Sequence, residues 1–87
     1  MVLTRVGNVV HISGHFFSSS DIAMTTALFE TIPSSLRPSY GFAIPGMFTI
    51  GDGSVAAYTV VVGADGTVKQ GLSAYVRSGF FAGQYLI

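Results

Sequence analysis

The sequence predicts an all-β fold of short antiparallel strands, a sandwich or a barrel, that assembles with further copies of itself. Three observations predict it: short runs of β-branched and aromatic residues, turn residues between them about every eight to twelve positions, and very few charges. The chain has 87 residues, which is enough for one domain, and we expect residues 1–87 to form it.

Charge is scarce for a soluble domain. Only 9% of the residues are charged, whereas 49% are hydrophobic. A well-dissolved small domain carries about 25–35% charged residues on its surface. A 9.1 kDa monomer exposes about 4,900 Å², and so few charges leave apolar patches in contact with water. We therefore expect other copies to cover part of the surface.

Composition also excludes several classes of partner. The chain has no cysteine, so it has no disulfides and no thiolate metal site. Its net charge is zero and its four basic residues are scattered, which predicts no nucleic-acid surface and no basic membrane-binding face. The longest apolar stretch, Val55–Val62, is far shorter than the ~20 residues of a spanning helix. Because residues 1–6 also lack the basic start of a signal peptide, we expect a soluble, non-secreted chain.

The first elements are predicted by alternation and by turn residues. Residues 2–6 and 9–16 alternate, and Gly7 with Asn8 between them predicts a hairpin. The serine-rich residues 18–21 predict a loop. Residues 22–32 are ambiguous: Asp21 would cap a helix there, whereas the threonines and Phe29 favour a strand or extended segment, which we prefer.

Prolines and glycines divide the rest of the chain. Pro33 and Pro38 bracket a turn, and Pro45 with Gly46 separates two short strands at 40–44 and 47–50. After a turn at 51–54, residues 55–62 form the clearest strand, whose three consecutive valines indicate burial on both faces. A turn at 64–66 leads to a strand at 67–70. Further strands are expected at 72–76 and 80–87, with a turn at 77–79.

Two features of the predicted strands point to assembly. The last strand is apolar up to Ile87 and would fray unless it docks into a sheet or against a neighbour. Phenylalanines occur as adjacent pairs, so one member of each pair must point away from the core. We expect the outward phenylalanine to lie at the contact between copies. The pairs are Phe16 with Phe17 and Phe80 with Phe81.

Four motifs follow one another along the chain: GNVVHISG at 7–14, TIPSSLRPS at 31–39, ADGTV at 64–68 and GQYLI at 83–87. Their order resembles the C-terminal head or tip domains of bacteriophage receptor-binding proteins and tail fibres, where a G-N-V-V strand precedes a T-L-P-x-x-x-R-P turn, a D-G-T-V hairpin and a final Y-L-I strand. The resemblance implies a small antiparallel β-sandwich of the jelly-roll kind that assembles as a homotrimer. It also implies a domain without catalysis or cofactor that attaches the virion to a bacterial surface receptor, often a saccharide.

The same resemblance implies a location in the virion, at a tail fibre or baseplate tip, with other tail proteins as partners. The chain would be either a distal domain of a longer fibre or a small virion protein in its own right. Two alternatives stay open. One is a purely structural trimerisation or cap module, and the other is a fragment of a polysaccharide depolymerase.

Saccharide recognition uses an aromatic face against the ring and charged or amide groups against its hydroxyls. Residues that could supply these groups are Tyr40, Asp52, Tyr58, Tyr75 and Arg77. The alternative for each tyrosine is packing in the core or between subunits. Arg37 is interpreted as structural, with its guanidinium bridging loop carbonyls or a carboxylate such as Glu30.

Catalysis and metal binding are not expected. Asp21, Asp52 and Asp65 lie in predicted turns, where aspartate accepts backbone N–H groups, and no serine stands in an elbow motif. His11 and His15 are four positions apart, about 13 Å along a strand, which is too far for both to bind one ion. We expect both to face solvent or a seam between subunits.

Overall fold

The structure is a computed structural model that describes residues 1–23, 26–71 and 75–87. The strands in these ranges form one six-stranded antiparallel sheet, ordered β1-β2-β6-β3-β4-β5. An all-β antiparallel fold is therefore confirmed. The strands are β1 (Val2–Val6), β2 (Val9–Ile22), β3 (Phe42–Ile50), β4 (Val55–Val62), β5 (Val68–Gln70) and β6 (Val76–Leu86), and a 3₁₀ turn (Ser34–Leu36) precedes β3.

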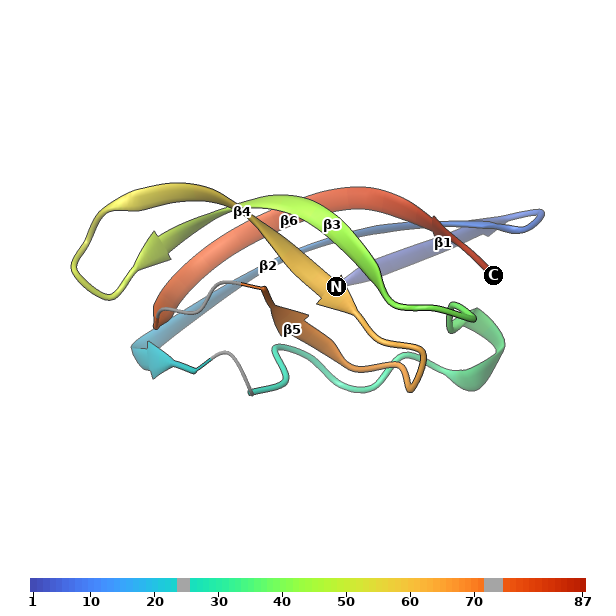
Figure 1. Ribbon diagram of the computed structural model, residues 1–87, viewed down its shortest axis with the longest axis horizontal. Helices are drawn as coiled ribbons and strands as arrows, with labels where there is room; N and C mark the ends of the chain where they lie inside the picture. Colours follow the sequence, from blue (N-terminus) through green and yellow to red (C-terminus); the bar gives the residue numbers. More distant parts are fainter. Residues whose placement is uncertain (24–25, 72–74) are drawn as a thin grey trace.

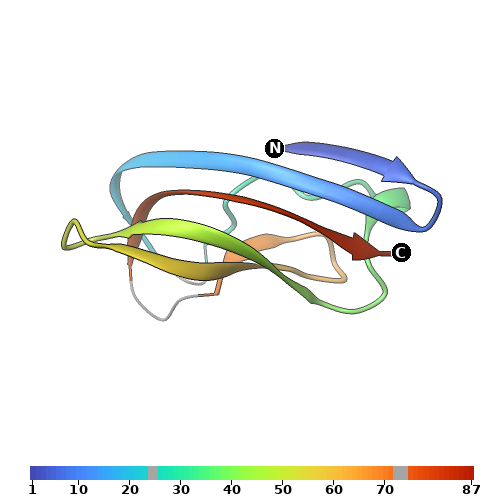
Figure 2. The same ribbon diagram turned by 90° about the horizontal axis from the view of Figure 1, so that it is seen from above.

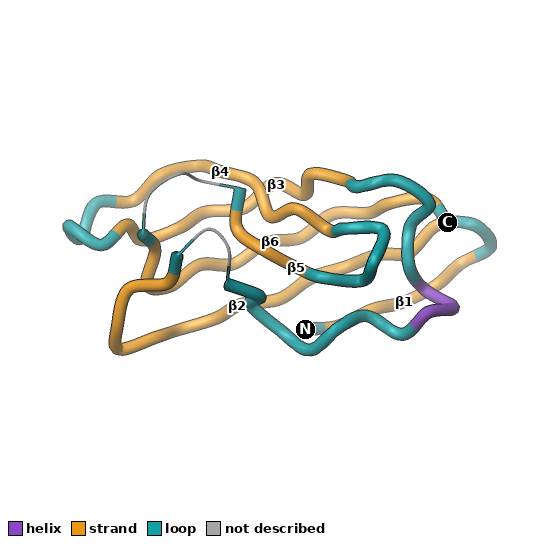
Figure 3. The backbone as a smooth tube through the Cα atoms, turned by 60° about the horizontal axis from the view of Figure 1, so that its bottom comes forward, coloured by secondary structure: helices purple, strands orange, loops and turns teal. Residues whose placement is uncertain are grey.

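The sheet is curled, and its two faces differ. Figures 1 and 2 show β3, β4 and β6 arching over β5 and the chain that links β2 to β3. That linking chain is held on the concave side by backbone bonds, from Leu28 N–H to Val68 O (2.8 Å) and from Ile32 N–H to Gly66 O (2.9 Å). Figure 3 shows the same segment crossing in front of the sheet. The opposite, convex face of the sheet is called the outer face below.

The hydrophobic core lies on the concave side. Strand alternation points every second residue inward, so that Val10 and Ile12 of β2 lie beside Phe81 and Tyr85 of β6, all at most 2% exposed. Ile32 of the linking chain closes the core and is fully buried. The core residues are Val10, Ile12, Ile32, Ile44, Phe48, Val60, Val62, Val68, Val76, Phe81 and Tyr85.

The N-terminal hairpin is confirmed, but its second strand is longer than predicted. Val6 pairs with Val9 across the two-residue turn, and Gly7 has a φ of 61° that suits glycine at the first turn position. The predicted loop at 18–21 is wrong, because β2 continues to Ile22 and pairs there with Val76. The register shifts between Phe17 and Ile22, so the serines form an irregularity inside the strand.

The predicted break at Pro45 and Gly46 is also wrong, since β3 runs through both residues. Ile50 N–H donates to Ser54 O and so points toward β4. Backbone N–H groups along a strand point alternately to its two neighbours, so the nitrogen of Pro45, five residues earlier, points toward β6. Pro45 stands one residue beyond the last β3–β6 pair, Gly46 with Phe81. The missing N–H therefore costs no ladder bond.

The C-terminal region shows one confirmed expectation and one correction. The predicted turn at 77–79 is wrong, because β6 is continuous and its Ser78 and Gly79 pair with both β2 and β3. The expectation that the last strand docks into a sheet is confirmed, since β6 lies between β2 and β3. Of the strand expected at 72–76, residues 72–74 lie outside the described residues, and Val76 begins β6.

Three further expectations can be compared with the structure. The strand at 55–62 and the turn at 64–66 are confirmed, but burial on both faces is wrong, because Val61 is 41% exposed between two buried valines. Residues 22–32, of which 24 and 25 are not described, contain the end of β2 and an isolated bridge from Ala27 to Lys69 but no further strand. A division of the strands into two facing sheets, as in a sandwich, stays a prediction.

Candidate functional site

One end of the sheet gathers three of the five residues that the sequence singled out for binding. Val76 pairs with Ile22 of β2 and with Ile50 of β3, so β2, β3 and β6 all reach this end. The β3–β4 turn at 51–54 is joined to the start of β6 by a bond from Gly51 N–H to Tyr75 O (2.9 Å). We call the group of Asp21, Asp52, Tyr75 and Arg77 the polar end.

An ion pair links two strands at the polar end. Arg77 Nε donates to Asp21 Oδ1 at 2.7 Å, across 56 positions of sequence, and the two side chains are 49% and 44% exposed. Gly51 lies directly against this pair, because a Cβ placed on it would be 3.1 Å from Asp21 Oδ1. The exposed pair presents both a guanidinium and a carboxylate to solvent.

Asp52 forms its own turn, as the sequence predicted. Its Oδ1 accepts bonds from Ser54 N–H (2.9 Å) and Ser54 Oγ–H (2.6 Å). These bonds to the ionised carboxylate lower the pKa of Asp52 below its ordinary value of 3.8. Both bonds end on Oδ1, which leaves Oδ2 as an acceptor for other partners.

Tyr75 supplies the aromatic group at the polar end. It is 59% exposed, and its carbonyl is fixed by Gly51. The polar end thus combines an exposed tyrosine with two carboxylates and a guanidinium. That combination can bind a hydroxyl-rich ring, with the aromatic face against its apolar side and the charged groups against its hydroxyls.

Tyr40 and Tyr58 do not belong to this group. Tyr40 is 78% exposed but precedes β3, whose nine residues separate it from the 51–54 turn by roughly 25 Å. Tyr58 lies within β4 opposite Gly46, on the same side of the strand as buried Val60, and is 39% exposed. The structure therefore brings three of the five candidate binding residues together at the polar end.

Sequence reasoning missed the role of Asp21. The serine-rich stretch before it predicted a loop, and in a loop aspartate is expected to cap the backbone. Instead Asp21 lies in β2 and pairs with Arg77. No local signal marks this pairing, because it depends on the β2–β6 register far along the chain.

The chemistry of the polar end favours binding over proton transfer. A general acid needs a carboxyl whose pKa is raised toward neutrality. At Asp52 the shift has the opposite direction, and the Asp21 carboxylate is engaged with Arg77. Both groups are therefore suited to accepting hydrogen bonds from ligand hydroxyls.

No cluster of three or more histidine, cysteine, aspartate or glutamate side chains suited to a metal ion occurs among the described residues. His11 and His15 both lie exposed on the outer face, as the sequence predicted, opposite Gln84 and Phe80 of β6. No helix within the described ranges has the length and apolar character needed to span a membrane.

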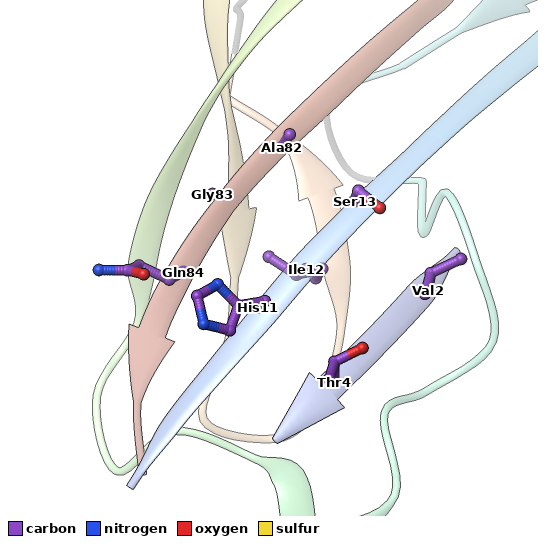
Figure 4. A pocket seen from close by; sticks show the side chains of 8 residues that line it. All are labelled: Val2, Thr4, His11, Ile12, Ser13, Ala82, Gly83 and Gln84. Atoms are coloured by element: carbon purple, nitrogen blue, oxygen red, sulfur yellow. The ribbon is translucent and has the colours of Figure 1, made fainter. Parts of the chain in front are cut away.

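The outer face is hollowed. One hollow has a volume of about 480 Å³ and is formed by β1, β2 and β6. Figure 4 shows His11 and Gln84 projecting from neighbouring strands at one side of it, with Ala82 and Gly83 along β6. No residue that the sequence singled out for binding lines this hollow.

The chain matches no protein-family model and no curated protein.

Proposed function

We propose that the chain is an attachment domain of a bacteriophage tail fibre or receptor-binding protein, which holds the virion to a bacterial surface saccharide. The domain would be a compact β-sandwich, with β5 and the chain linking β2 to β3 as its second layer, and would assemble as a homotrimer beside other tail proteins. The observation that carries the proposal is the polar end, where Tyr75, Arg77 and Asp52 lie together with Asp21.

Two features of the sequence support the same proposal. The order of the four motifs resembles phage receptor-binding domains over most of the chain, and the scarcity of charge favours an assembled subunit. A single exposed site of this size would bind weakly. Three sites held on one trimer raise the apparent affinity by avidity, by a factor of about 10²–10⁴ when the receptor is repeated on the cell surface.

The proposal is tested by the binding of the intact assembly to a glycan array and to host cells. We expect Tyr75→Ala and Arg77→Ala each to reduce binding at least about tenfold without changing the assembled mass. Tyr40→Ala is the matched control, because it removes another exposed tyrosine (78% against 59% for Tyr75) at the other end of β3 and is expected to leave binding unchanged. Absence of glycan and cell binding by the intact assembly would refute the proposal.

A purely structural trimerisation or cap module is the alternative. Such a module would have the same composition and the same outer face, but its polar end would bind nothing. In that case Tyr75→Ala and Arg77→Ala would leave virion adsorption unchanged. A depolymerase fragment would instead release reducing sugar from host capsule.

A further inference from the structure

The outer face of the sheet carries a distribution of side chains that a single copy of the chain does not explain. Every second residue of five strands lies on this face, as alternation and register require. These are the outward positions of β1, of 9–17 in β2, of 43–49 in β3, of β4 and of 78–86 in β6. None of these positions holds Asp, Glu, Lys or Arg. The few charges of the chain therefore lie in loops, in strand irregularities, on β5 or on the inner side of β1.

Large apolar side chains stand on this uncharged face. Phe17 is 83% exposed and Phe80 is 61% exposed, whereas Phe81, beside Phe80, is buried. The prediction that one phenylalanine of each pair points away from the core is thereby confirmed. Both rings belong to the same stretch of the β2–β6 ladder, where Phe17 pairs with Ser78 and Phe80 with His15. Further apolar side chains of the face are Val2, Met47, Val55 and Leu86.

The face also offers hollows beside these protruding side chains. One hollow of about 320 Å³ lies between Met47, Thr49, Val55 and Ser78, with Phe80 at its border. A second, of about 390 Å³, lies between Pro45, Ala57 and Ala82. Small residues at the outward positions create these hollows. Protruding aromatic rings and ring-sized hollows thus occur on one surface of one chain.

From these observations we infer that the outer face is the surface through which copies of this chain bind one another, with Phe17 and Phe80 of one copy seated in the hollows of the next. A surface that carries both the protruding groups and the hollows can place the rings of one copy in the hollows of the next, as the head-to-tail contacts of a closed ring require. Its lack of charge and its content of Phe and Met match the centre of a protein interface. A membrane-binding face would instead be bordered by basic residues.

The size of the face is sufficient for a stable interface. The molecule extends 40 × 18 × 18 Å. A face of 40 by 18 Å covers at most roughly 700 Å², and stable interfaces bury about 600–1,000 Å² on each partner. The inference deepens the proposed function, because it rests on an assembled domain and names the surface that assembles.

The test is the mass of the protein in solution, measured by sedimentation equilibrium over a range of concentrations. We expect the wild type to sediment as a multiple of 9.1 kDa. The double variant Phe17→Lys with Phe80→Lys should sediment as a single chain, with a dissociation constant raised at least about 30-fold, as loss of an interface hot spot produces. Tyr40→Lys, an exposed aromatic outside this face, is the matched control and should keep the wild-type mass.

A second measurement keeps the inference testable if the double variant fails to fold. Because the chain has no cysteine, Ala82→Cys on the outer face and Ser39→Cys in the loop before β3 can each be labelled with a maleimide. Both positions are exposed in a single chain. We expect only the thiol at position 82 to be protected, and only at concentrations where the protein assembles.

Three results would overturn the inference. They are a wild type that remains a single chain at millimolar concentration, a folded double variant that keeps the wild-type mass, and equal labelling at positions 82 and 39. These outcomes are distinguishable from failure of the proposed function. An assembly protected at position 82 that binds no glycan would refute attachment and leave the interface standing.

Discussion

The ring of Phe48 lies over Gly79 on the neighbouring strand, at the point where the β3–β6 ladder pairs the two residues. A Cβ on residue 79 would overlap this ring and would stand 2.9 Å from Met47 O. The same arrangement recurs at Gly14, where a Cβ would stand 2.9 Å from the Phe81 ring. Glycines on the concave side thus make the room in which the aromatic core packs.

Gly79→Ala is therefore expected to destabilise the fold. The added methyl group must displace the Phe48 ring or the β3 backbone, which costs about 1–3 kcal/mol. Thermal unfolding should show a drop in Tm of several degrees, since 1 kcal/mol corresponds to about 4–8 °C in a domain of this size. Gly41→Ala is the control, because its Cβ would meet only Val62 O at 3.6 Å. Equal Tm values for the two variants would contradict this explanation.

The Tyr85 hydroxyl joins the sheet to the 3₁₀ turn. It donates to Leu36 O at 2.7 Å, and the side chain is only 1% exposed. Tyr85→Phe removes the hydroxyl that donates to Leu36 O. We therefore expect the free energy of unfolding, measured in urea, to fall by about 1–2 kcal/mol. Tyr40→Phe, at a fully accessible hydroxyl, should unfold like the wild type. An unchanged midpoint for Tyr85→Phe would mean that water replaces the bond.

The same tyrosine makes the fold sensitive to alkali. Burial raises the pKa of Tyr85 above its ordinary value of 10.0, because it disfavours the phenolate. Above pH 10 the unfolded chain then releases this proton more readily than the folded chain, and the free energy of unfolding falls as the pH rises toward the folded pKa. Tyr85→Phe should have a shallower alkaline decline in stability. Parallel declines for the two proteins would be evidence against it.

Local signals in the sequence predicted the elements whose geometry is itself local. Gly7 with Asn8 and Asp65 with Gly66 set their turns through backbone conformation, and both hairpins are found. The errors at 18–21, at Pro45 and at 77–79 all fall in β2, β3 and β6. These strands lie in the interior of the sheet. Ser78 and Gly79 are paired with both neighbouring strands, Pro45 is paired with β4, and residues 18–21 lie between the paired residues Phe17 and Ile22. Pairing of the surrounding strand outweighs the preferences of single residues there.

The candidate site was predictable only in part, for the same reason. The sequence singled out Asp52, Tyr75 and Arg77 by residue type, but their proximity depends on how β2, β3 and β6 align. Asp21 belongs to the site because its side chain pairs with Arg77, 56 positions away along the chain. The outward direction of Phe17 and Phe80 was predictable, because it follows from alternation alone.

Acid should weaken the turn between β4 and β5. Asp65 Oδ1 accepts bonds from Thr67 Oγ1–H (2.7 Å) and Thr67 N–H (3.1 Å), and these bonds lower the pKa of Asp65 below 3.8. Because the pKa of Asp65 is lower in the folded chain, its bonds contribute fully to stability above the pKa of the unfolded chain, about 3.9. This contribution is lost as the pH falls through the folded pKa. Stability should therefore decline below about pH 4. Carbon-detected NMR titration of the carboxyl group measures the shift, and a midpoint at or above 3.8 would contradict it.

Arg37 joins the turn between Pro33 and Pro38 to Ile32, the residue bonded to the β4–β5 turn. Its Nε donates to Ile32 O at 2.7 Å in a partly buried position, which confirms the structural interpretation of this arginine. Ile32 N–H bonds in turn to Gly66 O, so the guanidinium fixes the residue that closes the core. Lysine has no donor at the Nε position, and Arg37→Lys is expected to lower the free energy of unfolding in urea by about 1 kcal/mol.

Arg5→Lys is the matched control. Arg5 Nε makes the same kind of bond, to Gly7 O at 2.8 Å, but in an exposed position. A change in the free energy of unfolding within about 0.5 kcal/mol is expected there. Equal losses for the two variants would show that the partial burial of Arg37 has no energetic consequence.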